Sequence, residues 1–189
     1  VPDEKDNWQF GSGAGFYLDA TQKPYNLNYN MYSYITKELT DLIQNNFDFD
    51  MTRQGIFGHS MGGHGALVIA LRNPKIYKSC SAFAPIVEPS TASWSHDAFQ
   101  KYIGPNKEDW KIYDSVALIR DGFYFPEILI DQGEADSFLN EGLRPWLLEE
   151  ACKQSGVDLK LRMQPGYDHS YFFISTFMTD HLIWHKERI

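Results

Sequence analysis

A serine between glycines is the first residue in this sequence that could do chemistry. Residues Gly58–Gly62 read Gly-His-Ser-Met-Gly, which places Ser60 at the centre of the pattern G-x-S-x-G. The apolar run Gln54–Gly58 predicts a strand before it, and small and aliphatic residues predict a buried helix after it. A serine on a tight turn between strand and helix exposes its hydroxyl and can act as a nucleophile. A helix N-cap is the alternative reading, but it does not explain glycines on both sides.

The glycines around Ser60 indicate that its backbone is crowded. A nucleophile on so tight a turn has a strained backbone, and side chains at Gly58, Gly62 and Gly63 are expected to clash with the neighbouring strand and helix. Because the helix begins directly after Ser60, the N–H of Met61 has no partner within the helix. We therefore predict that the Met61 N–H binds the oxyanion of a tetrahedral intermediate.

A serine hydroxyl is a weak nucleophile, so an imidazole must take its proton. In α/β-hydrolases, whose nucleophile occupies such a turn, an acid and then a histidine follow the serine along the chain. His169 lies in a turn after the predicted strand Leu159–Met163 and before a predicted terminal helix, Tyr171–Lys186, so it is the predicted base. A surface loop histidine is the alternative. The other candidates are expected to pack or to shape the pocket: His59, His64, His96, His181 and His185.

The acid is expected in the loop that follows the apolar run Phe125–Ile130. This loop offers three carboxylates, Asp131, Glu134 and Asp136. Asp131 is still close to strand geometry, and Glu134 is longer and less constrained. Asp136 lies deepest in the loop and is the predicted acid, with Asp131 left open as the alternative. Such an acid orients the imidazole and stabilises the imidazolium formed during attack.

The surrounding pattern alternates strands and helices, which predicts an α/β domain with a mostly parallel sheet and right-handed crossovers. Residues 1–29, rich in Gly, Pro and Asn, are expected to form a loop. The further predicted elements are a helix over Asn30–Phe47, a strand over Cys80–Ile86, an insertion over Trp94–Tyr113 and a helix over Leu143–Ser155. Residues 1–189 are expected to form one domain.

Composition narrows the function classes. A net charge of −8 without a Lys/Arg run argues against a nucleic-acid partner. No apolar stretch is long enough for a membrane helix, so we expect no membrane partner. Cys80 and Cys152, the two cysteines, are expected to be buried thiols in a reducing compartment, and no Cys/His cluster has metal-ligand spacing. We therefore expect no metal.

Several motifs together resemble one family, the S-formylglutathione hydrolases, also called the esterase D family. The similar segments span most of the chain: Gly13–Tyr17, Met31–Tyr34, Gly58–Leu67, Ser81–Ile86, Asp131–Gly133 and Gly166–Tyr171. The resemblance implies the α/β-hydrolase fold, with the nucleophile on Ser60, the acid on Asp136 and the base on His169. It also implies a cytoplasmic enzyme that hydrolyses S-formylglutathione to formate and glutathione in formaldehyde detoxification, and that cleaves short-chain esters. It implies no metal or organic cofactor, and it suggests a homodimer.

The resemblance also sets expectations about what this chain lacks. Family members have further strands before the segment that starts at Val1, including the loop with the second oxyanion N–H. We expect the chain to be the C-terminal two thirds of a longer α/β-hydrolase domain. Trp94 and Tyr171 are predicted to line the acyl pocket. The alternative functions are a general short-chain carboxylesterase of the same fold and a non-catalytic α/β-hydrolase-fold binding protein.

Overall fold

Four parallel strands form the centre of the protein, in a computed structural model that describes residues 8–189. Each strand pairs with the next one along the chain, in the order β1-β2-β3-β4. The strands are β1 (Gln54–His59), β2 (Tyr77–Phe83), β3 (Glu127–Gly133) and β4 (Asp158–Gln164). The parallel sheet predicted from the alternation of strands and helices is therefore confirmed, and its carboxyl ends share one edge.

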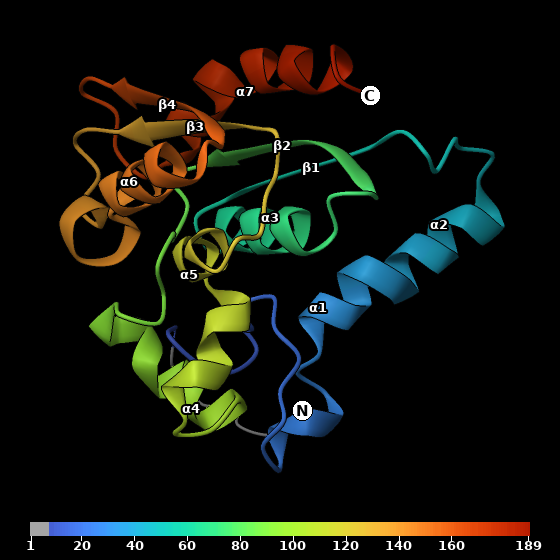
Figure 1. The fold of residues 1–189 in the computed structure, drawn as a ribbon, viewed down its shortest axis with the longest axis vertical. Helices are drawn as coiled ribbons and strands as arrows, with labels where there is room; N and C mark the ends of the chain where they lie inside the picture. Colours follow the sequence, from blue (N-terminus) through green and yellow to red (C-terminus); the bar gives the residue numbers. More distant parts are fainter. Residues whose placement is uncertain (1–7) are drawn as a thin grey trace.

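Helices cover both faces of this sheet. Figure 1 shows α7 (Tyr171–Lys186) on one face, with α3 (Met61–Arg72), α5 (Ser115–Arg120) and α6 (Pro145–Ser155) on the other. The central residues of β3, 128–130, are buried as a continuous run, as expected for a parallel strand with helices on both sides. This packing holds the strand ends, where the candidate site residues lie, on a rigid base.

The N-terminal helical segment extends away from the sheet (Figure 1). It runs through α1 (Met31–Ser33), a π-helical turn (Tyr34–Glu38) and α2 (Leu39–Asn46), close to the predicted helix over Asn30–Phe47. No residue of this segment is fully buried, although Ile35 packs against the core. Its apolar stripe is therefore only partly covered among the residues that the structure describes.

The connection from β2 to β3 is built from short helices. It contains α4 (His96–Tyr102), α5 and two 3-10 segments, Ser93–Ser95 and Lys107–Tyr113. The predicted insertion over Trp94–Tyr113 thus has the weak helical character expected of it. Tyr102 anchors the described part of the N-terminal loop, because its ring stacks on Phe10 at 4.8 Å and its hydroxyl donates to the Gly11 carbonyl. A short 3-10 turn over Tyr25–Leu27 lies in the same loop.

Several predicted boundaries are wrong. The strand expected from Cys80 begins at Tyr77, and the strand expected over Phe125–Ile130 is β3, Glu127–Gly133. The backbone explains two further differences. The strand expected over Cys80–Ile86 ends at Phe83, because Ala84 has a φ of 41°, which a strand cannot contain. The helix expected from Leu143 begins at Pro145, because Arg144 has a φ of 48°. Both deviations lie in loops beside the candidate site.

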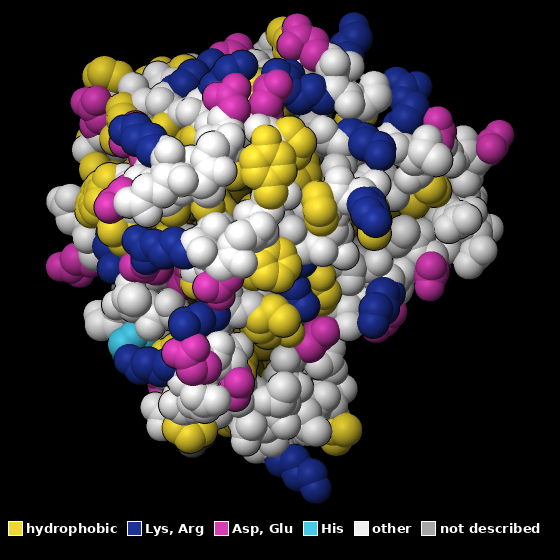
Figure 2. Space-filling model, viewed as in Figure 1, with side chains coloured by type: hydrophobic (Ala, Val, Ile, Leu, Met, Phe, Trp, Pro, Cys, Tyr) yellow, Lys and Arg dark blue, Asp and Glu magenta, His cyan; other side chains and the backbone are white. Residues whose placement is uncertain are grey.

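The surface has a mixed charge pattern. On the face drawn in Figure 2, Lys and Arg side chains alternate with Asp and Glu side chains, and hydrophobic side chains lie between them. Within residues 8–189, no helix is both long and apolar enough to cross a bilayer.

Candidate active site

Ser60 occupies the turn between β1 and α3. Its φ of 56° and ψ of −117° lie in a region that non-glycine residues rarely adopt, and residues held in such strained conformations cluster at active sites. The strand neighbours hold this turn, since the Ser60 N–H donates to the Phe83 carbonyl at 2.9 Å. The Ser60 carbonyl accepts the N–H of His64 at 2.9 Å, which starts the helix. The strand-turn-helix context predicted for the G-x-S-x-G motif is therefore present.

The glycines of the motif differ in how much space surrounds the position of a missing Cβ atom. A Cβ at Gly58 would lie 2.3 Å from the Gly62 carbonyl oxygen, and one at Gly63 would lie 3.0 Å from the Pro85 side chain. A Cβ at Gly62 would meet only the Tyr17 hydroxyl, at 3.7 Å, which is ordinary contact. The prediction that all three glycines clear space is therefore wrong for Gly62, because its missing side chain faces open room beside Tyr17.

His169 and Asp136 form a close pair. The Nδ1 of His169 lies 2.5 Å from Oδ2 of Asp136, and the Asp136 side chain is fully buried. The other carboxylate oxygen of Asp136 accepts the Phe138 N–H at 2.8 Å. A carboxylate accepts hydrogen bonds only, so the shared proton belongs on Nδ1 and leaves Nε2 of His169 free to act as a base.

The loops that carry the acid and the histidine are packed directly against each other. The Ala135 N–H donates to the Tyr167 carbonyl at 2.9 Å. A Cβ at Gly133 would lie 2.3 Å from that same carbonyl oxygen, so only glycine allows this approach. The glycine at the end of the Asp131–Gly133 motif thus lets the loop that carries His169 pack against the loop that carries Asp136.

Two further rings hold the imidazole of His169. The His59 ring lies 4.4 Å from it between centroids, and the Phe138 ring lies 5.1 Å from it in an edge arrangement. Burial and the nearby His169 lower the pKa of His59 to about 4, so His59 is neutral at pH 7. His59 directly precedes Ser60, and Phe138 lines the same pocket as Ser60, so both rings that contact His169 belong to residues near the nucleophile.

A small apolar pocket opens at Ser60. Its volume is about 200 Å³. It is lined by Trp8, Gly13, Ser60, Met61, Ile86, Phe138 and Leu143. Met61 is the first residue of α3, so its N–H has no partner within the helix and is available to an oxyanion beside Ser60.

Of the two residues predicted to line the acyl pocket, Tyr171 is not among the described residues that line this one. Tyr171 begins α7, two residues after His169, and is 85% exposed. Trp94 lies in the 3-10 segment Ser93–Ser95, and its side chain is outside the part of the chain that the structure describes. Ile86, Phe138 and Leu143 take the lining positions instead, and their ordinary apolar character gave no signal in the sequence.

The remaining carboxylates of the acid loop have other surroundings. Asp131 is buried against Arg162, Gln164 and His181, on the side of the sheet where α7 packs. Burial raises its pKa, but the hydrogen bonds from His181, Arg162 and Gln164 outweigh burial and hold the pKa below its usual value. Glu134 is exposed. Of the three carboxylates, only Asp136 contacts His169 among the hydrogen bonds of the described residues.

The other histidines have structural partners. His64 is fully buried and donates to the Phe16 carbonyl at 3.0 Å, and burial lowers its pKa to about 4. His96 contacts the Ser90 carbonyl at 3.1 Å. His181 and His185 meet at the hydroxyl of Ser81, at 2.8 Å each, in a buried polar chain between α7 and β2. Within residues 8–189, no group of three His, Cys, Asp or Glu side chains is arranged to hold a metal.

Gln132 is a site residue that the sequence reasoning missed. Its side chain is fully buried, and its Nε2 donates to Oδ2 of Asp136 at 3.3 Å, the same oxygen that contacts His169. Gln132 therefore helps to orient the acid. The signal was its place in Asp131–Gly133, where a polar amide at the end of a buried strand needs an internal partner.

Comparisons with known proteins agree with this geometry. The family model "Esterase: Putative esterase" matches residues 1–183. The S-formylglutathione hydrolase of Rattus norvegicus is 50% identical over 190 residues, which cover 99% of this chain and 67% of that protein. The S-formylglutathione hydrolase of Paracoccus denitrificans is 49% identical over 184 residues, covering 97% of this chain and 66% of that protein.

A solved structure is similar over the whole chain. The S-formylglutathione hydrolase from Agrobacterium tumefaciens is 63% identical, with a TM-score of 0.98, and the match covers 100% of this chain and 68% of that one. The chain thus spans about two thirds of the length of these relatives. With a serine on a strained turn, a buried His–Asp pair and this degree of identity, the chain is a serine hydrolase that belongs to the Esterase family and, within it, to the S-formylglutathione hydrolases.

Proposed function

We propose that this protein hydrolyses the thioester S-formylglutathione to formate and glutathione, the reaction of formaldehyde detoxification. The observation that carries the proposal is the identity of 49–50% to S-formylglutathione hydrolases of a mammal and a bacterium over nearly the whole chain. The same identity recurs in organisms as distant as a mammal and a bacterium, and both relatives carry the same name.

The proposed catalytic residues are Ser60 as nucleophile, His169 as base and Asp136 as the acid that orients it. His169 Nε2 takes the Ser60 proton as the hydroxyl oxygen attacks the formyl carbonyl. The Met61 N–H stabilises the oxyanion, and the C–S bond then breaks to release glutathione, which takes the proton from His169. Water, deprotonated by His169, attacks the formyl ester and releases formate and Ser60.

The small pocket at Ser60 supports a short acyl group. Sites for drug-sized ligands typically have volumes of roughly 300–1,000 Å³. The pocket here, at about 200 Å³, is smaller, and most of its lining surface is apolar. A formyl group and other short acyl groups suit such a pocket, which is consistent with a side activity on short-chain esters.

The test is the rate of S-formylglutathione hydrolysis by the full-length enzyme, followed at the thioester absorbance, beside its Ser60→Ala variant. We expect rapid turnover in the wild type and a loss of roughly 10⁴-fold or more in kcat in the variant, because the covalent step disappears. Turnover of short p-nitrophenyl esters that depends on Ser60, without thioester turnover, would replace the proposal with a general carboxylesterase. Binding of glutathione thioesters without any turnover would indicate a non-catalytic relative.

Three further proposals follow from family membership. We propose that residues 1–189 act as a single α/β-hydrolase domain, supported by the single core cluster that joins the described elements. We propose a cytoplasmic location, supported by Cys80 and Cys152, which are both buried and free, as in a reducing compartment. We propose a homodimer, which light scattering on the full-length protein will test.

A further inference from the structure

Two walls of the pocket at Ser60 come from separate loops. Ile86 belongs to the loop after β2, whereas Phe138 and Leu143 belong to the segment between β3 and α6. Among the described residues, one backbone hydrogen bond joins these loops, from the Val87 N–H to the Leu143 carbonyl, and at 3.4 Å it is long. The distance between the two walls must therefore be set largely by side chains.

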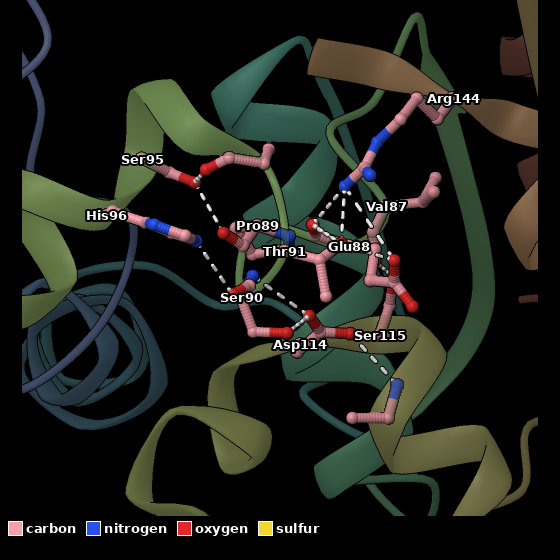
Figure 3. Close-up of polar contacts among 12 residues, drawn as sticks. Val87, Glu88, Pro89, Ser90, Thr91, Ser95, His96, Asp114, Ser115 and Arg144 are labelled. Atoms are coloured by element: carbon pink, nitrogen blue, oxygen red, sulfur yellow. Dashed lines mark hydrogen bonds and ion pairs between the residues drawn. The ribbon is translucent and has the colours of Figure 1, made fainter. Parts of the chain in front are cut away.

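Arg144 makes that connection. Its Nη2 donates to the backbone carbonyl of Glu88 at 2.7 Å and to the Thr91 hydroxyl at 2.8 Å, and it lies 3.7 Å from the Glu88 carboxylate. Figure 3 shows the guanidinium reaching across to this turn. The side chains of Arg144 and Glu88 are only 17% and 10% exposed, so water screens their attraction much less than at the surface.

Arg144 is not required to neutralise Glu88. The other carboxylate oxygen of Glu88 already pairs with Arg120 at 3.0 Å. The shortest contact of Arg144 is with a backbone carbonyl, which carries no net charge. The main role of Arg144 is therefore to bind the backbone of the Glu88–Thr91 turn, and not to neutralise the Glu88 carboxylate.

The turn that Arg144 contacts is anchored from its other side. The N–H and hydroxyl of Ser90 both donate to Asp114, at 3.1 and 2.5 Å, and Ser115 donates to the Val87 carbonyl at 2.7 Å (Figure 3). Asp114 and Ser115 lie at the start of α5, which packs against α3 and α6. The turn is therefore a fixed point, against which Arg144 can hold the opposite loop.

The backbone of Arg144 places this contact directly beside the pocket wall. Arg144 has a left-handed φ of 48° and lies between Leu143, a wall residue, and Pro145, the first residue of α6. A non-glycine residue in such a conformation is strained and persists only where its surroundings hold it. A shift of the Arg144 side chain would therefore move the Leu143 wall.

We propose that Arg144 is a specificity-determining positioning residue: by joining the Leu143 loop to the Glu88–Thr91 turn, it keeps the acyl pocket narrow and selects formyl and other short acyl groups. This inference rests on the proposed function, because it assumes acyl transfer through Ser60. Without the contact, the Leu143 wall moves away from Ile86 and longer acyl chains enter.

The experiment compares Arg144→Met with the wild type in the full-length enzyme. The measurement is the ratio of kcat/KM for p-nitrophenyl hexanoate to that for p-nitrophenyl acetate. We expect the ratio to rise by roughly 10-fold, the lower end of the discrimination that one methylene gives in an apolar pocket. Ile86→Ala, which opens the opposite wall, serves as a positive control for the response of the ratio.

The matched control is Arg188→Met. Arg188 also forms a partly buried ion pair, with Glu127 at 2.7 Å, and is 20% exposed, but it lies beyond the end of α7 and does not line the pocket. We expect the ester ratio of this variant to equal that of the wild type. An equal rise in Arg188→Met, or a parallel fall of both esters in Arg144→Met, would overturn the proposal, because either would show general loosening.

A second variant covers a failure of Arg144→Met to fold, which thermal unfolding would reveal. Thr91→Val keeps both charges and removes the hydroxyl that accepts from Arg144 and donates to the Glu88 carboxylate. Its ratio should rise in the same direction, and an unchanged ratio rejects the proposal. The ratio uses simple esters and stays separate from thioester turnover. A wild type inactive on S-formylglutathione with a ratio that responds to Arg144 would reject the proposed substrate and retain the role of Arg144.

Discussion

Two aspartates five positions apart have different environments at the level of single residues. Asp136 contacts His169 and Gln132, at the mouth of the site, whereas Asp131 contacts His181, Arg162 and Gln164 behind the sheet. The first arrangement orients an imidazole, and the second joins β3, β4 and α7. The same side chain thus has a different expected effect in each place.

Substitution of each aspartate by asparagine should separate these roles. Asp136→Asn should lower kcat by roughly 10⁴-fold with little change in KM, because an amide favours the wrong imidazole tautomer. Asp131→Asn should lower the free energy of unfolding by roughly 3 kcal/mol, because it leaves the buried side of Arg162 and His181 without their anion. Ester kinetics and urea unfolding measure the two effects. A greater loss of kcat in a folded Asp131→Asn variant would reverse the assignment of the acid.

At the level of the elements, the strained turn at Ser60 requires the backbones of β1 and α3 to lie very close together. The strand β1 and the helix α3 meet very closely. A Cβ atom added at Gly58 would lie only 2.3 Å from the carbonyl oxygen of Gly62. Gly62 itself lies in the first turn of α3 with open space around it. The two glycines of the motif therefore have opposite expected tolerance.

Replacement of each glycine by alanine tests this difference. Gly58→Ala should destabilise the protein by several kcal/mol or prevent folding, because backbone atoms must move to admit the Cβ. Gly62→Ala should leave stability unchanged or raise it by up to about 1 kcal/mol, because alanine is the better helix former. Thermal unfolding of both variants measures the effect. Equal destabilisation by the two substitutions would show that the turn is not held by the Gly58 contact.

At the level of the whole molecule, buried and partly buried histidines connect stability to pH. Burial lowers the pKa values of His64 and His185 to about 4, and burial together with His169 does the same for His59. Their ordinary pKa is about 6.5, so the unfolded chain binds these protons at a higher pH than the folded chain does. Stability that is present above pH 6.5 is therefore lost as the pH falls toward 4.

Urea unfolding at pH 7, 6 and 5 should show this loss. Each histidine that stays neutral in the fold adds a slope of up to about 1.4 kcal/mol per pH unit over that window. His64→Gln keeps a donor for the Phe16 carbonyl and removes one titrating group, so its free energy of unfolding should vary less steeply with pH. A slope equal to that of the wild type would show that folding does not lower the pKa of His64.

The sequence by itself determined what depends on neighbouring residues. The G-x-S-x-G pattern located the strained turn, alternating apolar runs predicted four parallel strands, and the terminal helix begins and ends at the predicted residues Tyr171 and Lys186. These features follow from backbone conformation and hydrophobic period, which act over a few residues. The triad of Ser60, Asp136 and His169 was proposed from the same local context together with chain order.

Only the tertiary structure decided what depends on distant contacts. His169 meets Asp136 across 33 positions, and Arg144 meets Glu88 across 56. Such pairs depend on how the loops pack at the strand ends, which no local pattern encodes. For the same reason, the pocket is lined by Ile86, Phe138 and Leu143 rather than by Tyr171. The chemistry is therefore readable from short motifs, whereas the shape of the site is set by packing between segments far apart in the chain.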